Sequence, residues 1–228
     1  MAGPRTERPN FWSSLSQVDR TELHRIGHVK RFPANSLVLR EDDPSDYVLV
    51  LRAGCAKVAS DSGIGYQTVL ALRDPGDLVG EQASVEGGGR SASVYALTDV
   101  EALVVPAPRF TAFRQARPLV ERVVQRILSS RLREADRYRT AAGADTVPQR
   151  LALLLLDLGR RYGTAGAGGT VVVALPLSQE DLAGLVLTSK RTIGRVLEQW
   201  REQGYVATAR RAITIRNPAG LEQAANSA

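Results

Sequence analysis

The spacing of the apolar residues changes near residue 117, and this change constrains the fold more than any other feature of the chain. Between Arg31 and Pro108, short runs of Val, Leu and Ala alternate with turn signals at intervals of about 8–12 residues. That pattern is typical of an antiparallel roll or barrel of β-strands. From residue 117 to 139 the apolar residues instead recur every three or four positions, which is the period of a helix. The sequence therefore predicts an α+β protein in which a jelly-roll-like unit precedes a long helix.

The long helix carries an apolar stripe that favours association with a second copy of the chain. The stripe consists of Val120, Val124, Ile127, Leu128, Leu132 and Ala135. The helix is long and leads away from the strand-rich part, so a dimer seam is the favoured interpretation. Packing of the same stripe on its own domain is the alternative.

The composition favours a folded chain of one or two domains with an anionic partner. The 228 residues are 43% hydrophobic, and the net charge is +6. Only three of the 30 basic residues are Lys, and the others are Arg, which can bind phosphate or guanine through two parallel hydrogen bonds. A GC-rich genome would produce the same bias toward Arg.

Cysteine usage and hydropathy indicate a cytoplasmic protein without a membrane anchor. Cys55 is the single cysteine, which excludes an intrachain disulfide and an iron–sulfur cluster held by several cysteines of one chain. The first ten residues lack the apolar core of a secretory signal, and the longest aliphatic run, residues 151–156, is far shorter than the roughly 20 residues that span a bilayer.

A glycine loop lies between two short polar motifs in residues 79–92. Arg90 and Ser91 can donate hydrogen bonds to phosphate oxygens, and Glu81 can accept one from a ribose hydroxyl. Gly80 would allow backbone N–H groups to approach the phosphate if a helical turn begins there. A Glu and an Arg nine residues apart could equally form a surface salt bridge. As a whole, the segment predicts a pocket for a cyclic nucleotide.

The segment from residue 177 to 200 has the pattern of a helix-turn-helix. Ser178 can cap its first helix, and Thr188 or Ser189 its second. Basic residues cluster near the start of the second helix, where a recognition helix reads base edges, and Arg or Lys there can contact guanine. A solvated basic helix is the alternative. The predicted DNA-binding residues are Ser178, Thr188, Ser189, Lys190, Arg191, Thr192, Arg195 and, in a two-stranded wing, Arg210 and Arg211.

Other segments lead to local predictions. Residues 15–29 and 147–162 are predicted to be helices, and residues 171–175 a short strand. Residues 164–170 are expected to form a flexible loop, and the last ten residues are expected to be frayed.

The two motifs together make the chain resemble the cyclic-AMP receptor protein/fumarate–nitrate regulator family over nearly its whole length. Gly80-Glu81, an apolar stretch and Arg90-Ser-Ala match the family's phosphate-binding cassette, and Arg73-Asp-Pro-Gly-Asp-Leu-Val leads into it as the family does. The resemblance implies a cyclic-nucleotide-binding β-roll at 11–116, a dimerisation helix at 117–139, a hinge at 140–147 and a winged helix-turn-helix at 148–220. It also implies double-stranded DNA, a second copy of the chain and RNA polymerase as partners.

Several residues depart from the family pattern. Gln82 stands where the family usually has an aliphatic residue, and Ala135 and Asp136 occupy the positions of its adenine-binding Thr-Ser pair. Arg191 replaces the usual base-reading Glu, and Leu187 replaces the usual turn Gly. Cyclic AMP is the first candidate effector, while another nucleotide or a relic pocket in a constitutive regulator stays open. The predicted ligand-binding residues are Gly80, Glu81, Gln82, Arg90, Ser91, Ala92 and Asp136.

A cupin-like enzyme is the remote alternative. His24 and His28 are four residues apart and could clamp a metal, but they precede the first predicted strand and no third ligand is near. The sequence contains no P-loop, no Gly-x-Ser-x-Gly and no His-Glu-x-x-His motif. We therefore predict no enzymatic activity, no metal site and no prosthetic group.

Overall fold

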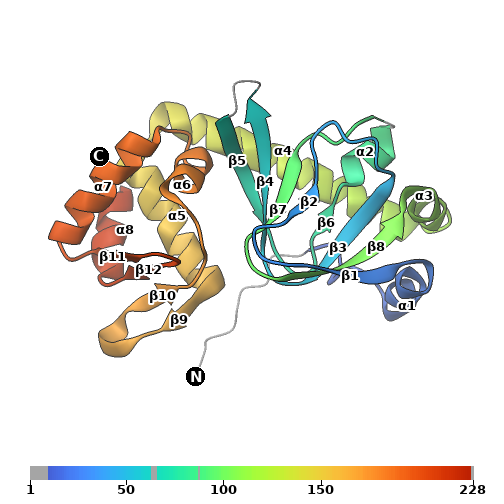
Figure 1. Cartoon of the computed structure of the whole chain (residues 1–228), viewed down its shortest axis with the longest axis horizontal. Helices are drawn as coiled ribbons and strands as arrows, with labels where there is room; N and C mark the ends of the chain where they lie inside the picture. Colours follow the sequence, from blue (N-terminus) through green and yellow to red (C-terminus); the bar gives the residue numbers. More distant parts are fainter. Residues whose placement is uncertain (1–9, 63–65, 87, 227–228) are drawn as a thin grey trace. The chain divides into compact units, whose positions relative to one another are not determined.

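The computed structural model describes residues 10–62, 66–86 and 88–226 (Figure 1). The described residues divide into two compact units, residues 10–133 and residues 134–226. The long helix α4 (Pro118–Ala144) contributes residues to both units. Among the described residues, no helix has both the length and the hydropathy needed to cross a bilayer.

Eight strands form two antiparallel sheets in the described part of the first unit. One sheet has the order β1-β8-β3-β6 and the other the order β2-β7-β4-β5. This arrangement confirms the predicted β-roll. The strands are β1 (His28–Phe32), β2 (Leu37–Leu39), β3 (Tyr47–Ala53), β4 (Ala56–Ser62), β5 (Tyr66–Arg73), β6 (Leu78–Val79), β7 (Ser93–Ala96) and β8 (Val100–Pro106).

Strand β3 is buried on both faces, and it separates two hydrophobic clusters. Val48 and Val50 pack in one cluster, which also holds Phe110 and the start of α4. Leu49 and Leu51 pack in the other, between the two sheets. Successive side chains of a strand point to opposite faces, so an unbroken apolar run can supply two cores at once.

The helix predicted at residues 15–29 is shorter in the structure. Helix α1 (Gln17–Ile26) ends at Gly27, where an added Cβ would lie 2.8 Å from the carbonyl oxygen of Val104. From His28 onward the chain pairs with β8, with His28 opposite Val104. The prediction was wrong at this end because strand pairing, which local sequence does not reveal, replaces the last helical turn.

Helix α4 is longer than the predicted helix at 117–139, and it continues through most of the expected hinge. Residues 140–144 are helical, and helix α5 (Val147–Tyr162) starts after Thr146, whose side chain caps it. The break between the helices is therefore confined to Asp145 and Thr146. The first four residues of the apolar stripe, Val120, Val124, Ile127 and Leu128, pack in the core of the first unit, whereas Leu132 is 61% exposed.

The second unit has a four-stranded antiparallel sheet of order β11-β12-β10-β9 within its described residues. The predicted two-stranded wing is thus one half of a larger sheet. The last ten residues were predicted to be frayed, but residues 219–226 belong to helix α8 (Pro218–Asn226), which packs on α5 and buries Leu221, and residues 227–228 lie outside the described part of the chain. The other elements are β9 (Gly163–Ala165), the short 3-10 helix η1 (Ala167–Gly169), β10 (Val171–Val173), α6 (Gln179–Leu185), α7 (Lys190–Glu202), β11 (Val206–Ala209), β12 (Ala212–Ile215) and α8 (Pro218–Asn226).

Candidate ligand pocket and DNA-binding surface

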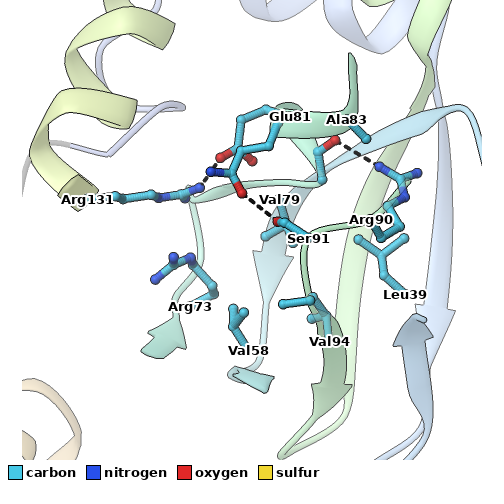
Figure 2. Close-up of a pocket in the computed structure, with 13 residues that line it drawn as sticks. Leu39, Val58, Arg73, Val79, Glu81, Ala83, Arg90, Ser91, Val94 and Arg131 are labelled. Atoms are coloured by element: carbon cyan, nitrogen blue, oxygen red, sulfur yellow. Dashed lines mark hydrogen bonds and ion pairs between the residues drawn. The ribbon is translucent and has the colours of Figure 1, made fainter. Parts of the chain in front are cut away.

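A small cavity lies where the cassette meets the β-roll and α4 (Figure 2). Six of the seven predicted ligand-binding residues line it, and the seventh, Asp136, lies in the other unit, where it forms an exposed ion pair with Arg139. The lining residues are Leu39, Val58, Arg73, Val79, Gly80, Glu81, Gln82, Ala83, Arg90, Ser91, Ala92, Val94 and Arg131.

Gly80 shapes the turn that starts the cassette. Its φ is +79°, and a Cβ there would lie 2.6 Å from Nη1 of Arg90 and 3.1 Å from Cδ1 of Leu39. Only glycine adopts this conformation at low cost and leaves this space. Directly after it, helix α2 (Glu81–Glu86) begins, which is the helical turn that the cassette pattern requires.

Arg90 is held by three protein acceptors. Its Nε donates to Oγ of Ser45 at 3.1 Å, Nη1 to the carbonyl oxygen of Gly80 at 2.8 Å, and Nη2 to that of Tyr47 at 2.6 Å. The side chain is buried, and burial lowers the pKa of the guanidinium, while Tyr47 and nearby carboxylates act in the opposite direction. A guanidinium has five N–H donors, so these bonds leave donors for a ligand phosphate.

Glu81 is buried and paired with Arg131 of α4, a residue that the sequence reasoning missed. Arg131 Nη1 contacts the Glu81 carboxylate (Figure 2), and Nη2 donates to the carbonyl oxygen of Leu78 at 2.6 Å. A signal was present in the sequence: Arg131 precedes Ala135 by four residues and so lies on the same helix face. The pair joins the cassette to the long helix.

Gln82 lines the pocket and is bonded to Ser91. Ser91 Oγ donates a hydrogen bond of 2.5 Å to Oε1 of Gln82 (Figure 2). This amide oxygen therefore takes the bond that Ser91 would otherwise offer to a phosphate oxygen. An aliphatic side chain at position 82 could not accept it.

The cavity has a volume of about 60 Å³. Pockets that enclose small-molecule ligands measure about 300 Å³ or more, so the cavity as it stands is too small to enclose a nucleotide. Three guanidinium groups, those of Arg73, Arg90 and Arg131, line the cavity together with the carboxylate of Glu81. The surplus of positive charge suits an anionic ligand.

The two helices of the helix-turn-helix are capped as their sequence predicts. Ser178 and Asp181 form a capping box at α6, in which each side chain bonds the other's backbone N–H at 3.0 and 2.8 Å. Ser189 rather than Thr188 caps α7, because its Oγ accepts from the backbone N–H of Thr192 at 3.1 Å. These caps fix where the recognition helix begins.

The outward side of α7 presents its basic residues to solvent. Lys190, Arg191 and Arg195 are exposed, as are Arg210 and Arg211 in the turn between β11 and β12, while Thr192 is half-buried beside its cap. The opposite face of α7 buries Ile193, Val196, Leu197 and Trp200. Lys190 Nζ lies 3.8 Å from Oε2 of Glu180, an exposed pair that DNA can displace.

The turn between α6 and α7 has a left-handed residue. Leu187 has a φ of +54°, and its backbone N–H bonds the carbonyl oxygen of Gly184 at 3.2 Å. The family usually has glycine at this position, and glycine adopts a positive φ at low cost. Leu187 adopts this left-handed conformation at the cost of backbone strain.

Two family models match the sequence, one over the unit that holds the pocket and one over the helix-turn-helix. Residues 29–117 match the model of the cyclic nucleotide-binding domain, and residues 149–224 match that of the Crp-like helix-turn-helix domain. The cyclic AMP receptor protein of Thermus thermophilus is 30% identical over 197 residues, which cover 85% of this chain and 86% of that protein. The chain belongs to the cyclic-AMP receptor protein/fumarate–nitrate regulator family. It is a transcriptional regulator with a cyclic nucleotide-binding domain and a DNA-binding helix-turn-helix, and not an enzyme.

Further relatives agree with this family assignment. The CRP-like cAMP-activated global transcriptional regulator of Mycobacterium tuberculosis is 27% identical over 194 residues, or 85% of this chain and 86% of that protein. The crystal structure of the Thermus thermophilus catabolite activator protein has a TM-score of 0.53 at 27% identity and covers 94% of this chain and 97% of its own. FixK2 from Bradyrhizobium japonicum shares the fold, with a TM-score of 0.75 at 24% identity over 89% of this chain and 99% of its own.

Proposed function

We propose that this regulator acts as a homodimer whose affinity for its operator is set by a cyclic nucleotide, with cyclic AMP as the first candidate. The observation that carries the proposal is the gathering of Gly80, Glu81, Arg90 and Ser91 around one cavity, with Arg131 of α4 on the same wall. Relatives named as cyclic AMP receptor and cAMP-activated proteins support this choice of ligand.

The second half of α4 supports the dimer. Leu132 and Tyr138 are two large side chains of the 27-residue helix α4, and they are 61% and 41% exposed in the single chain. A second copy of the same helix would cover these side chains. In this scheme residues 11–116 are the sensor, α4 is the dimerisation helix, and residues 148–220 bind DNA.

The polar groups of the pocket suggest how a ligand acts on α4. A phosphate would draw Ser91 away from Gln82 and use the remaining donors of Arg90, and a ribose hydroxyl would share Glu81 with Arg131. Because Arg131 belongs to α4, rearrangement of the Glu81–Arg131 pair would shift the equilibrium between conformations of that helix. Asp136 lies outside the cavity and pairs with Arg139, so its contact with the base stays a prediction from the sequence.

On the DNA side, we assign Lys190, Arg191 and Arg195 to base reading and Arg210 and Arg211 to phosphate. Ser178, Thr188, Ser189 and Thr192, at the starts of the two helices, would complete the contacts with the DNA backbone. Arg191 favours guanine or phosphate, so the operator differs from that of relatives with Glu at this position. RNA polymerase is the further partner if the regulator activates transcription, and we place the protein in the cytoplasm.

Calorimetric titration of the purified chain with cyclic AMP and cyclic GMP tests the ligand. We expect saturable binding that weakens about tenfold in Ser91→Ala, since a hydrogen bond to a charged group is lost. Ser84→Ala is the matched control, because Ser84 lies in the same cassette but does not line the cavity. Arg90→Ala is less suitable, because it also removes three hydrogen bonds of the fold.

A constitutive regulator is the second candidate, and the small size and internal hydrogen bonds of the pocket favour it. The cavity is small, and Glu81, Gln82, Arg90 and Ser91 all have partners within the protein. The test is operator binding by fluorescence anisotropy with and without nucleotide. Equal affinities with and without nucleotide, together with no heat of nucleotide binding, would support the constitutive regulator and contradict control by a ligand.

A further inference from the structure

Arg150, in the first turn of α5, binds carbonyl groups from two separate segments. Its Nε donates to the carbonyl oxygen of Val186 at 2.9 Å and Nη2 to that of Leu187 at 3.4 Å. Its Nη1 donates to the carbonyl oxygens of Asp145 and, at 3.5 Å, of Ala142. One half-buried side chain therefore bonds both the end of α4 and the turn of the helix-turn-helix.

Both segments present carbonyl groups that attract a cation. The last carbonyls of a helix have no intrahelical partner and carry the negative end of the helix dipole, which applies to Ala142 in α4. Val186 and Leu187 lie in the turn after α6, where Leu187 has left-handed backbone geometry. A planar guanidinium with a fixed fork of donors can bind acceptors on both sides at once, whereas a lysine ammonium is a single point of charge.

We propose that Arg150 is a positioning residue that fixes the direction of the recognition helix relative to the end of α4. Its acceptor Leu187 comes two residues before Ser189, the cap of α7, so the bond restrains the start of the recognition helix. The inference rests on the proposed dimer, in which α4 forms the axis and each subunit supplies one α7.

The consequence concerns the spacing of the two half-sites in the operator. A symmetric dimer of this class reads half-sites about one helical turn, roughly 34 Å, apart, and that distance depends on the direction in which each α7 leaves the dimer axis. With Arg150 in place, one spacing is favoured. Without its four hydrogen bonds, α7 samples several directions, and the dimer accepts several spacings.

The experiment compares operators that differ only in spacer length. An operator is first selected from random duplexes with the wild-type protein, and affinities are then measured by fluorescence anisotropy for that spacer and for spacers one base pair shorter and longer. We expect the wild type to bind the selected spacer at least about tenfold more tightly than the altered spacers. In Arg150→Lys and Arg150→Gln this ratio should fall below about threefold, while the affinity for non-operator DNA stays unchanged. Arg160→Gln is the control, because Arg160 is an exposed arginine of the same helix that pairs with Asp157.

The outcomes separate this inference from the proposed function. Discrimination that survives in both Arg150 variants overturns the inference, and so does an equal loss of affinity for every duplex with a lower melting temperature, which marks a purely structural role. A wild type without any spacer preference refutes the dimeric function, and the inference falls with it.

A second measurement applies to any variant that folds but binds DNA poorly. Spin labels at positions 137 and 199, both exposed, report the distance between α4 and α7 in a Cys55→Ala background. We expect a narrow distance distribution in the wild type and a broad one in Arg150→Lys. An equally narrow distribution in both proteins would overturn the inference.

Discussion

Leu187 adopts a backbone conformation that glycine reaches more easily. Its φ is +54°, and the left-handed region costs a residue with a Cβ about 1–2 kcal/mol. The side chain is 44% exposed, so its removal sacrifices little packing. We expect Leu187→Gly to raise the free energy of unfolding by about 0.5–1 kcal/mol, since the greater entropy of glycine in the unfolded chain offsets part of the gain. Urea titration of the purified wild type and variant measures this change in the free energy of unfolding.

A matched control is Leu153→Gly. Leu153 is 50% exposed but lies inside helix α5. There glycine should lower the free energy of unfolding by about 1 kcal/mol. If both substitutions destabilise the protein equally, strain at Leu187 is not the reason for the effect.

A single hydrogen bond of Gln82 competes with ligand binding in the pocket. Its hydrogen bond with Ser91 must break before a phosphate can use Ser91. A net hydrogen bond is worth about 0.5–1.5 kcal/mol, so Gln82→Leu should raise the affinity for cyclic AMP about 3–10-fold. Calorimetry on Gln82→Leu, Ser91→Ala and the double variant tests the coupling. The gain should vanish in the Ser91→Ala background, and a gain that persists there would contradict this role.

At the scale of elements, α1 is held on β3 by a cluster around Trp12. The guanidinium of Arg52 lies 4.0 Å from the centre of the Trp12 ring, and its Nη1 is 3.2 Å from Nε2 of His24. The His24 ring also meets Trp12 edge to face at 5.4 Å. Only the neutral imidazole can accept a hydrogen bond from Arg52.

This cluster predicts a pH dependence. Burial and the charge of Arg52 lower the pKa of His24 in the folded protein. The folded state thus binds fewer protons than the unfolded chain, so the contribution of His24 to stability is present above about pH 6.5 and is lost as the pH falls through the folded-state pKa. NMR titration of the two histidine rings, with His28→Gln to assign them, measures this pKa. We expect it to rise in Arg52→Ala, and an unchanged value would remove Arg52 as a cause.

At the scale of the whole molecule, the positive charge supports DNA binding through phosphate contacts. The chain has a net charge of +6, and Arg210 and Arg211 lie exposed in the turn between β11 and β12. Each phosphate contact contributes about 0.9 to the slope of log affinity against log salt concentration. The double variant Arg210→Ala, Arg211→Ala should therefore reduce that slope by up to about 2, for operator and non-operator DNA alike.

Two variants complete this comparison. Arg25→Ala changes the net charge but lies in the sensor unit, where Arg25 pairs with Glu22, and it should leave the slope unchanged. Arg191→Ala should instead lower affinity for the selected operator by about 1–3 kcal/mol and relax the preference at one base pair. A slope that follows net charge alone would count against the assigned contacts.

Features that depend on neighbours along the chain can be predicted from the amino-acid sequence. Helix α5 spans the predicted residues 147–162, and Ser178 and Ser189 cap the two helices of the helix-turn-helix as predicted. The cassette residues lie around one cavity because the turn at Gly80 and the loop before Arg90 return the chain to the same place. Caps, periods and turn residues act over a few positions, so they can be read locally.

Tertiary structure decided the features in which distant segments compete for the same groups. Strand β1 replaces the end of a predicted helix because β8 supplies its hydrogen bonds, and α8 is ordered because α5 buries Leu221. The partner of Glu81 is Arg131, 50 residues away, and Arg150 bonds a turn 36 residues further on. Backbone carbonyls and buried carboxylates accept any donor that packing brings within reach, so only the folded chain decides which donor that is.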